Sequence, residues 1–442
     1  ELIDDACFYV KEKWLDNINL ELARVLTYEE AISGRADISE YMGPIHRQSS
    51  PGYPWIKSRK SNFPGKTGWF GNDEVYLYDA EVRGVVEHRI NQAKLGIRTS
   101  TLWTDTLKDE RRPHEKVLAY KTRVFSNGPM DFNIAFRMYY LGFIAHLMEN
   151  RIDNEVSIGT NVYSRDWTKT AHKLMEKGEK VIAGDFSGFD GSLHTAMMLK
   201  FVEIANEFYD DGEENALVRL VLMLEIINSV HICDRSVYQM THSQPSGNPA
   251  TTPLNCLINS LGLRMCFSYL AKKYNKPYTL KDFEKYVSIV SYGDDNVINF
   301  ADEIAEWYNM ETLTTAFKVF GFTYTDELKG KNGEVPKWRK LDQVAYLKRK
   351  FRKREDFPIY DAPLDIETIM EMPNWCRETV DVFEGTKINA ETAIMELHMH
   401  DKETFSIKSN LIKRQFALVS GKRLETHPYD MYFKERMIKY FM

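Results

Sequence analysis

The stretch VSIVSYGDDNVINF, residues 287–300, is apolar and β-branched except for two adjacent carboxylates at its centre. Val287, Ile289 and Ser291 alternate with Ser288, Val290 and Tyr292, and Val297 and Ile298 follow. This period-two pattern predicts two strands joined by a turn at Gly293-Asp294. Asp294 and Asp295 then lie at the tip of a hairpin.

The rest of the chain alternates between periodic and irregular segments. Residues 1–135 are rich in Gly, Pro and aromatic clusters and indicate loops and short strands rather than helices. Residues 131–150 have a helical period, and an apolar strand, VIAGD, precedes a helix from about Gly191 to Tyr209. A second long helix is predicted after TTPLN (251–255), before the hairpin, and the region after Arg354 is mainly helical. The expected fold class is α+β, with a strand-helix-helix-hairpin core and two appended regions.

Composition excludes several classes of protein. The chain has 442 residues, 43% of them hydrophobic, and a net charge of −6, so any polyanion must be bound by local clusters of basic residues. Five dispersed cysteines without a C-x-x-C pair argue against disulfide or zinc scaffolds and favour a reducing compartment. The longest apolar run, residues 217–230, contains Arg219 and Glu225, so no transmembrane segment is expected. The start without Met indicates a fragment or a product cut from a longer precursor.

Carboxylates in two distant segments suggest a metal site. Adjacent carboxylates about 4 Å apart repel by about 4 kcal/mol at an effective dielectric of 20 unless water, a proton or a cation intervenes. Asp294-Asp295 is also compatible with a solvated turn, and Asp190 in GDFSGFDGSLH (184–194) with a helix N-cap, but a cap does not explain Asp185 at the end of a buried strand. If the two strands pair, Asp185, Asp294 and Asp295 converge. Oxygen ligands favour Mg²⁺ or Mn²⁺, and two such ions would catalyse nucleotidyl transfer.

Two further segments add polar and basic groups. In QPSGNPATTPLNCLINS (244–260), Thr251, Asn255 and Asn259 recur every four residues, which is typical of either an ordinary helix start or a row of groups that read a sugar hydroxyl. Residues 108–123 contain six basic side chains and three acidic ones, and residues 337–354 contain nine basic and one acidic. Each is compatible with a solvated charged surface, but together they predict local phosphate-binding stripes on an acidic chain.

In order along the chain, GDFSGFD, SGNPATTPLN and YGDD resemble motifs A, B and C of the RNA-dependent RNA polymerases of picornavirus-like positive-strand RNA viruses. SSPGYPW (49–55) resembles the template-entrance loop, and TLKDERRPHEKVLAYKTRVF (106–125) the basic fingers motif. FGFTYTDELK (320–329) resembles the segment that ends in a proton-donating lysine, and VAYLKRKF (344–351) the hairpin that touches the primer. Seven matches in the family's order, from residue 49 to 351, make the resemblance specific. Within this family, GDFSGFDGSLH resembles the corresponding segment in polymerases of an insect-virus lineage related to the dicistroviruses.

The resemblance implies a role for each matching residue. Asp185, Asp294 and Asp295 bind the metal ions, Mg²⁺ with Mn²⁺ as a substitute, and Lys329 donates a proton to pyrophosphate. Asp190, Ser246, Thr251 and Asn255 select the ribose 2′-hydroxyl. The remaining nucleotide-binding residues are Lys108, Arg112, Lys116 and Arg123, and the RNA-binding residues are Ser49, Ser50, Gly52, Tyr53, Lys348 and Arg349.

The resemblance also implies a right-hand polymerase closed by fingertips. The expected domains are fingers (1–135, with roughly 225–245), palm (136–224 and 246–351) and a short helical thumb (352–442). The expected partners are an RNA template and primer, NTPs, a small genome-linked protein primer and other viral replication proteins, and the expected location is the host cytoplasm at membrane-associated replication complexes. Two alternatives remain: a non-catalytic RNA-binding protein, and a reverse transcriptase, which usually has an aromatic residue in place of Asp190.

Overall fold

The computed structural model describes residues 1–59, 61–72, 74–328, 335–376 and 381–441. Its first region contains helices and a strand pair: α1 (Leu2–Trp14), α2 (Tyr28–Ser33), α3 (Thr67–Phe70), α4 (Ala80–Lys94), β1 (Leu102–Leu107), α5 (His114–Leu118) and β2 (Val124–Asn127). The middle region contains α6 (Met130–Glu149), α7 (Arg165–Lys173), β3 (Lys180–Ser187), α8 (Thr195–Tyr209), α9 (Glu213–Ile227), β4 (Val230–Cys233), β5 (Ser236–Gln239), α10 (Thr251–Lys273), α11 (Phe283–Tyr286), β6 (Val287–Tyr292), β7 (Asp295–Phe300), α12 (Met310–Val319), β8 (Thr323–Asp326), β9 (Ala345–Tyr346) and β10 (Arg349–Lys350). The last region contains β11 (Arg352–Lys353), β12 (Tyr360–Asp361), α13 (Ile366–Glu371), α14 (Val382–Leu397), α15 (Lys402–Ser420) and α16 (Tyr429–Phe441).

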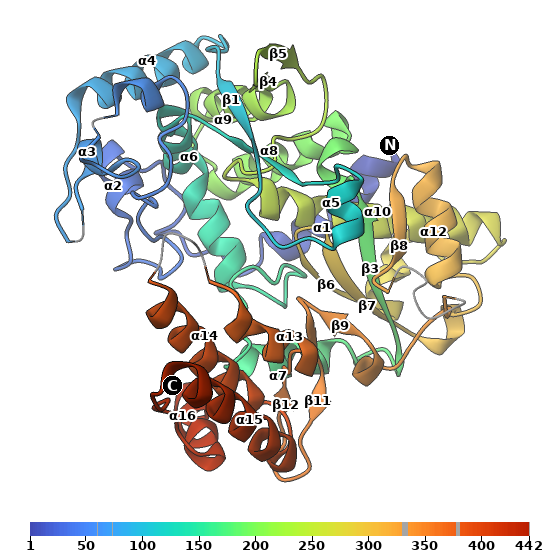
Figure 1. Ribbon diagram of the computed structural model, residues 1–442. Coiled ribbons are helices and arrows are strands. Elements are labelled where there is room, and N and C mark those ends of the chain that lie inside the picture. Colours follow the sequence, from blue (N-terminus) through green and yellow to red (C-terminus); the bar gives the residue numbers. More distant parts are fainter. Residues whose placement is uncertain (60, 73, 329–334, 377–380, 442) are drawn as a thin grey trace.

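The central antiparallel sheet has the strand order β6-β7-β3-β8 and lies beside α10 (Figure 1). Ile182, Ile289 and Ile298 point into the large core shared with the helices. The alternate residues, such as Val181 and Val297, pack in a second core with Trp167 of α7. Because side chains alternate across a strand, one apolar run supplies both faces of this buried sheet.

Helix α10 is buried along most of its length, because apolar residues cover every side of it. It contacts the sheet through β6 and also packs against α1, α8 and α12. Residues at its amino-terminal end are therefore held rigidly against the hairpin of β6 and β7.

A second sheet, of order β2-β1-β4-β5, brings the first region against residues 230–239. In it β1 pairs with β4 in parallel, with Leu102 opposite Val230. The sequence prediction that a segment near 225–245 joins the first region agrees with this pairing, while the exact domain boundaries stay predictions.

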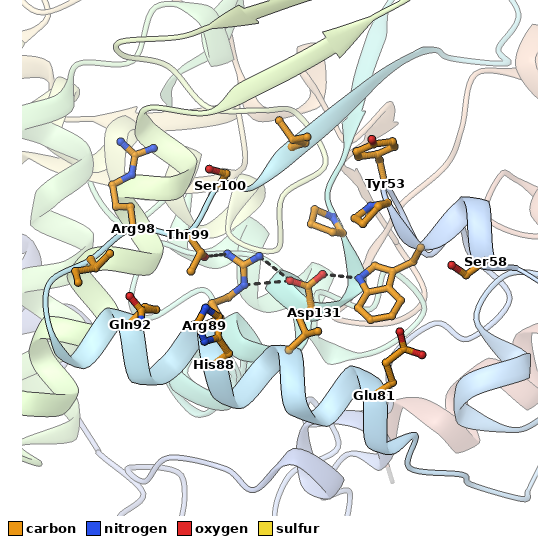
Figure 2. Close-up of a pocket in the computed structure, with 16 residues that line it drawn as sticks. Tyr53, Ser58, Glu81, His88, Arg89, Gln92, Arg98, Thr99, Ser100 and Asp131 are labelled. Carbon is orange, nitrogen blue, oxygen red and sulfur yellow. Dashed lines mark hydrogen bonds and ion pairs between the residues drawn. The ribbon is translucent and has the colours of Figure 1, made fainter.

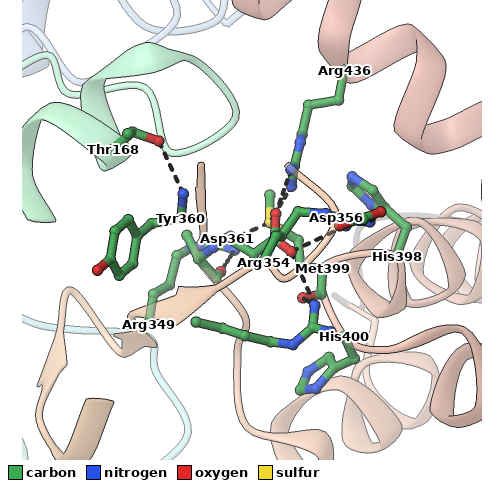
Figure 3. Close-up of polar contacts among 12 residues, drawn as sticks. Thr168, Arg349, Arg354, Asp356, Tyr360, Asp361, His398, Met399, His400 and Arg436 are labelled. Carbon is green, nitrogen blue, oxygen red and sulfur yellow. Dashed lines mark hydrogen bonds and ion pairs between the residues drawn. The ribbon is translucent and has the colours of Figure 1, made fainter. Parts of the chain in front are cut away.

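The C-terminal helices, orange to red in Figure 1, form a separate layer with their own core of residues such as Ile394, Phe405 and Phe416. Buried Asp361 fixes this layer to β11 and β12 through Arg352, Arg354 and Arg436, the last of which lies on α16 (Figure 3). The end of the chain is thus tied to the strands that precede the helices.

Several predicted elements are confirmed. The hairpin is formed by β6 and β7, the VIAGD strand by β3 and the helix at 131–150 by α6, which gives the expected α+β fold. No helix among the described residues is both long and apolar enough to cross a bilayer.

The interpretation of residues 1–135 as loops and short strands was wrong in part. Helix α1 buries Ala6, Val10 and Trp14 at helical spacing, and α4 is capped by Asp79, whose side chain accepts a hydrogen bond from the Val82 backbone N–H. The Gly and Pro clusters between these helices concealed both patterns.

Three predicted helix boundaries also differ. Helix α8 begins at Thr195, because residues 189–191 form a 3-10 turn. Helix α10 includes TTPLN instead of following it. The helical region at 364–383 is divided, because the 3-10 turn Met372–Asn374, which contains a proline, ends α13.

Candidate active site

The carboxylates of the two distant segments meet at one end of the central sheet. In the β6–β7 hairpin Tyr292 pairs with Asp295, leaving Gly293 and Asp294 as a two-residue turn, with Gly293 at φ +65°. Strand β3 pairs with β7 so that Gly184 lies opposite Asn296. The next residues in each direction are Asp185 and Asp295, so the predicted convergence is confirmed.

A cleft of about 1060 Å³ opens over these carboxylates. Its walls come from the basic segment of the first region, the turn after β3, the start of α10 and the β9–β10 hairpin. Its lining includes all but one of the residues predicted for catalysis and nucleotide binding: Asp185, Asp294, Asp295, Lys108, Arg112, Lys116, Arg123, Asp190, Ser246, Thr251 and Asn255. The exception is Lys329, which lies outside the described residues.

The cleft disfavours ionised carboxyl groups in the absence of a cation. Desolvation, followed by the charges of Asp294 and Asp185, raises the pKa of Asp295 to about 6. The pKa of Asp294 is raised as well, first by desolvation and then by the nearby Asp190 and Asp185. Mutually repelling carboxylates in a partly dry cleft gain most from a bound cation.

The donor chemistry fits Mg²⁺ or Mn²⁺, since the groups at the tip of the sheet are carboxylate oxygens. Among the described residues, no three His, Cys, Asp or Glu side chains form a preformed metal cage. Mg²⁺ tolerates this arrangement because it binds through one or two carboxylates and completes its shell with water and substrate phosphates. Asp185, Asp294 and Asp295 are therefore the residues that could hold such an ion.

Of the two roles considered for Asp190, the structure excludes that of N-cap of α8. Asp190 lies in the 3-10 turn Phe189–Gly191, and the residue at the N-cap of α8 is His194. Asp190 Oδ1 instead accepts hydrogen bonds from Asn255 Nδ2 at 2.9 Å and Gln244 Nε2 at 3.0 Å. This links the turn after β3 to the start of α10 and leaves Asp190 on the wall of the cleft.

Gln244 is a site residue that the sequence interpretation missed. Its side-chain amide, nearly fully buried, also donates to Asn255 Oδ1 at 2.6 Å. One glutamine thus fixes the orientation of both Asp190 and Asn255. Its place at the start of the quoted QPSG segment was the available signal, but the partner Asp190 is 54 residues away.

The loop at Ser246-Gly247 is attached to the first region. The Ser126 backbone N–H donates to the Ser246 carbonyl at 2.6 Å, and the Gly247 N–H donates to Thr251 Oγ1 at 3.2 Å. Gly247 has φ +113°, and a Cβ atom there would lie 2.7 Å from the Ser126 carbonyl oxygen. The close approach of the two backbones requires glycine.

The basic segment at 108–123 divides between two surfaces. The predicted Lys108, Arg112, Lys116 and Arg123, with the unpredicted Lys121, line the cleft. Arg111 points elsewhere: its guanidinium lies 3.9 Å from the centre of the Trp375 ring and 3.1 Å from Glu371 Oε2. Arg111 therefore joins the first region to the C-terminal helices.

The second basic stripe, at 337–354, is mostly neutralised by acidic partners, in contrast to the prediction. Seven of its nine basic residues form ion pairs, including Arg349 with Glu396 of α14. Lys348 lies at the tip of the β9–β10 hairpin and lines the cleft. An RNA contact by Lys348 agrees with this position, whereas Arg349 is directed to α14 and its RNA contact stays a prediction.

The predicted template-entrance loop is held at the start of α6 beside a second cavity of about 840 Å³ (Figure 2). Trp55 Nε1 donates to Asp131 Oδ1 at 2.6 Å, and Arg89 holds the other carboxylate oxygen. Tyr53 lines this cavity rather than the acidic cleft.

The start of the same loop reaches β2. The Ser50 hydroxyl accepts a hydrogen bond from Asn127, and the Ser49 hydroxyl one from buried Lys66. Gly52, at φ +74°, lies against the backbone of Gly128, where a Cβ atom would be 2.5 Å from the carbonyl oxygen. The loop is thus rigidly placed, while its RNA contacts stay predictions.

Comparison with known proteins gives one consistent result. The family model for viral RNA-dependent RNA polymerases matches residues 3–416. The chain is 60% identical over 447 residues to part of the replicase polyprotein of Acute bee paralysis virus (strain Rothamsted), covering 100% of this chain and 23% of that polyprotein. It is 41% identical over 426 residues to the replicase polyprotein of Cricket paralysis virus, covering 92% of this chain and 24% of that polyprotein. The chain thus spans about a quarter of the length of these relatives, both from insect viruses as predicted.

The fold has a solved counterpart. A Sicinivirus 3Dpol RNA-dependent RNA polymerase superimposes with a TM-score of 0.79 at 20% identity, covering 99% of this chain and 86% of the other. This similarity confirms the α+β polymerase fold.

Proposed function

This chain belongs to the family of viral RNA-dependent RNA polymerases, and we propose that it extends an RNA primer by two-metal-ion nucleotidyl transfer at Asp185, Asp294 and Asp295. It is an enzyme of RNA synthesis. One observation carries the proposal: acidic side chains from two distant segments meet at the end of one sheet, inside a cleft with basic walls. The raised pKa of Asp295, caused by desolvation and by neighbouring carboxylates, supports the proposal that cations complete this arrangement.

The side chains of the cleft divide the work of the reaction. Asp185, Asp294 and Asp295 would hold two Mg²⁺ ions, which would supply Lewis-acid chemistry to the attacking 3′-hydroxyl and the leaving pyrophosphate. Cationic side chains on the facing wall, Lys108, Arg112, Lys116 and Arg123, neutralise and orient the triphosphate. Lys329 is assigned the donation of a proton to pyrophosphate.

Ribose selection is assigned to the hydrogen-bonded group around Asp190. Its carboxylate is already oriented by Asn255 and Gln244, so a further hydrogen bond with a 2′-hydroxyl needs little reorganisation. Thr251 and Ser246 line the same wall. A deoxyribose would leave these polar groups without that partner, which favours NTPs over dNTPs.

Primer extension on homopolymeric RNA with Mg²⁺ tests the proposal. Asp294→Ala should abolish incorporation while RNA affinity is retained, and Asp302→Ala, an exposed acid paired with Lys180, serves as the matched control with full activity. Synthesis by the Asp294 variant at the wild-type rate would refute its metal role. A protein that binds RNA without any synthesis, or that accepts dNTPs as readily as NTPs, would support one of the two alternative functions.

Initiation from a small genome-linked protein is a further part of the proposal, as are other viral replication proteins as partners and a location at membrane-associated replication complexes in the host cytoplasm. The small C-terminal layer, with a core of its own, supports a primer-dependent start, since a short thumb leaves room for a primer. Comparison of primed and unprimed templates tests this point. Equal yields from both would contradict it.

A further inference from the structure

We infer that Asn259, Asn296 and Tyr324 are positioning residues that fix the turn bearing Asp294 and Asp295. This inference deepens the proposed function and rests on it, since it assumes that these carboxylates bind the metal ions. None of the three side chains lines the cleft. They are buried beneath the turn and contact its backbone rather than the substrate.

The three side chains form one chain of hydrogen bonds that ends on the turn. Tyr324 Oη donates to Asn296 Oδ1 at 2.8 Å, and Asn296 Nδ2 donates to Asn259 Oδ1 at 2.9 Å. Asn259 Nδ2 then donates to the Gly293 carbonyl at 2.6 Å. The Gly293 carbonyl can only accept, so the Asn259 amide must face it with Nδ2, and the Asn296 amide must then face Asn259 with its own Nδ2. The orientation of both amides is therefore unique.

These hydrogen bonds hold the backbone on both sides of Asp294 and Asp295. Gly293 precedes Asp294, Asn296 follows Asp295, and both are bonded to the same side chain, Asn259 of α10. Asn259, Asn296 and Tyr324 are each at most 1% exposed. Buried polar groups that are fully bonded to one another specify one geometry, because any shift of the turn leaves one of them unsatisfied.

A second contact holds the same turn from α10. The Gly293 N–H donates to Cys256 Sγ at 3.2 Å, and the Cys256 thiol donates to the Ser291 carbonyl at 3.4 Å. Both peptide groups of Gly293 are therefore fixed by side chains one turn apart on α10. The positive φ of Gly293 is maintained by these contacts.

Strand β3 has a residue that makes the arrangement possible. A Cβ atom at Gly184 would lie 1.8 Å from the Tyr324 hydroxyl oxygen. Glycine at this position lets the hydroxyl pass across β3 to Asn296, directly beside Asp185. Burial also raises the pKa of Tyr324 well above its ordinary value, so the hydroxyl keeps the proton that it donates.

The row of polar residues on α10 now has a common purpose. Asn255 orients Asp190 for the ribose, and Asn259, one turn further on, orients the metal-binding turn. One rigid helix therefore sets the distance between the sugar contact and the reacting phosphate. A displacement of reacting atoms by about 1 Å can lower a rate by roughly 100-fold. A change in the distance between the sugar contact and the reacting phosphate should therefore lower the rate of transfer more than the affinity for substrate.

Tyr324→Phe is the sharpest variant, because it removes a single oxygen atom. We expect a fall in kcat of about 10-fold to 100-fold, an unchanged affinity for RNA and an increase of at least 3-fold in the Mg²⁺ concentration for half-maximal rate. Mn²⁺, which binds such oxygen ligands more tightly, should restore part of the rate. Asn259→Ala should show the same signature.

Tyr308→Phe is the matched control. Tyr308 is equally buried, and its hydroxyl contacts the Leu263 carbonyl at 3.4 Å in the body of α10, away from the turn. It should lower the melting temperature to a similar degree while leaving kcat and the Mg²⁺ requirement unchanged.

A distinct result would overturn the inference. Suppose that the melting curve shows Tyr324→Phe to be folded, and that its Mg²⁺ requirement and kcat equal those of the wild type. In that case the hydrogen bonds from Tyr324 to Gly293 have only a structural role. Failure of the proposed function is recognised separately, because in that case Asp294→Ala itself retains synthesis.

Discussion

The side-chain amide of Asn255 donates a 2.9 Å hydrogen bond to Asp190 Oδ1, although the two residues are 65 positions apart. This contact places the carboxylate on the wall of the cleft. We expect Asp190→Ala to reduce the preference for NTPs over dNTPs by about 10-fold or more, because the variant lacks the carboxylate that we propose as the hydrogen-bonding partner of the 2′-hydroxyl. Single-nucleotide incorporation with matched NTP and dNTP pairs measures the effect.

Ser192→Ala provides a control for ribose selection. The Ser192 hydroxyl donates within the same turn, to the Phe189 carbonyl, and is not part of the cleft lining. Its variant should keep the wild-type preference. An unchanged preference in Asp190→Ala would count against the assignment of Asp190.

The raised pKa of Asp295 makes the stability of the metal-free protein depend on pH. Between the ordinary carboxyl value of 3.8 and about 6, the folded protein binds more protons than the unfolded chain, so its stability falls as pH rises through this window. Asparagine does not ionise, so Asp295→Asn should not lose stability at this position as the pH rises. Without divalent ions, we expect the variant to exceed the wild type in stability by about 1 to 3 kcal/mol at pH 8 and to match it at pH 4.

Thermal melting at the two pH values, with and without Mg²⁺, measures this difference. Mg²⁺ should stabilise the wild type more than Asp295→Asn at pH 8. Asp302→Asn, at an exposed position, should show neither effect. A variant less stable than the wild type at pH 8 without Mg²⁺ would contradict the account.

Arg111 connects the basic segment to the C-terminal helices through Glu371 and Trp375. Both partners of the ion pair are about half exposed, so solvent screens the pair and its contribution to stability is small. We expect Trp375→Ala to speed dissociation of the RNA complex by about 5-fold, with little change in kcat. Stopped-flow dissociation from a labelled primer-template measures it, with Arg111→Lys as the variant that keeps the charge.

Buried Asp361 carries the attachment of α16 (Figure 3). Asp361→Asn would leave Arg352, Arg354 and Arg436 without their shared counter-charge and should destabilise the C-terminal region by about 3 kcal/mol in urea titrations. Asp356→Asn removes a largely exposed partner of Arg354 and should cost less than about 1 kcal/mol. Equal effects of the two variants would show that Asp361 is not the anchor.

Local patterns predicted the parts of the site that depend on a strand or a turn. The alternation in residues 287–300 placed Asp294 and Asp295 at the tip of a hairpin, and the apolar VIAGD segment placed Asp185 at the end of a strand. The pairing of that strand with the hairpin was a condition of the prediction, and the structure supplies it. The basic residues at 337–354 misled the interpretation because their partners, such as Glu396 and Asp361, come from other elements. Gln244 was missed for the same reason, since its role appears only when Asp190 is next to it.

The central claim is that Asp185, Asp294 and Asp295 bind two divalent ions during RNA synthesis. Anomalous diffraction from crystals of the enzyme with primer-template RNA, a non-hydrolysable NTP analogue and Mn²⁺ tests it most directly. We predict two Mn²⁺ peaks about 3.5 to 4 Å apart, in contact with these carboxylates and the triphosphate. An ordered NTP analogue in the cleft without a Mn²⁺ peak at Asp185 or Asp294 would contradict the account.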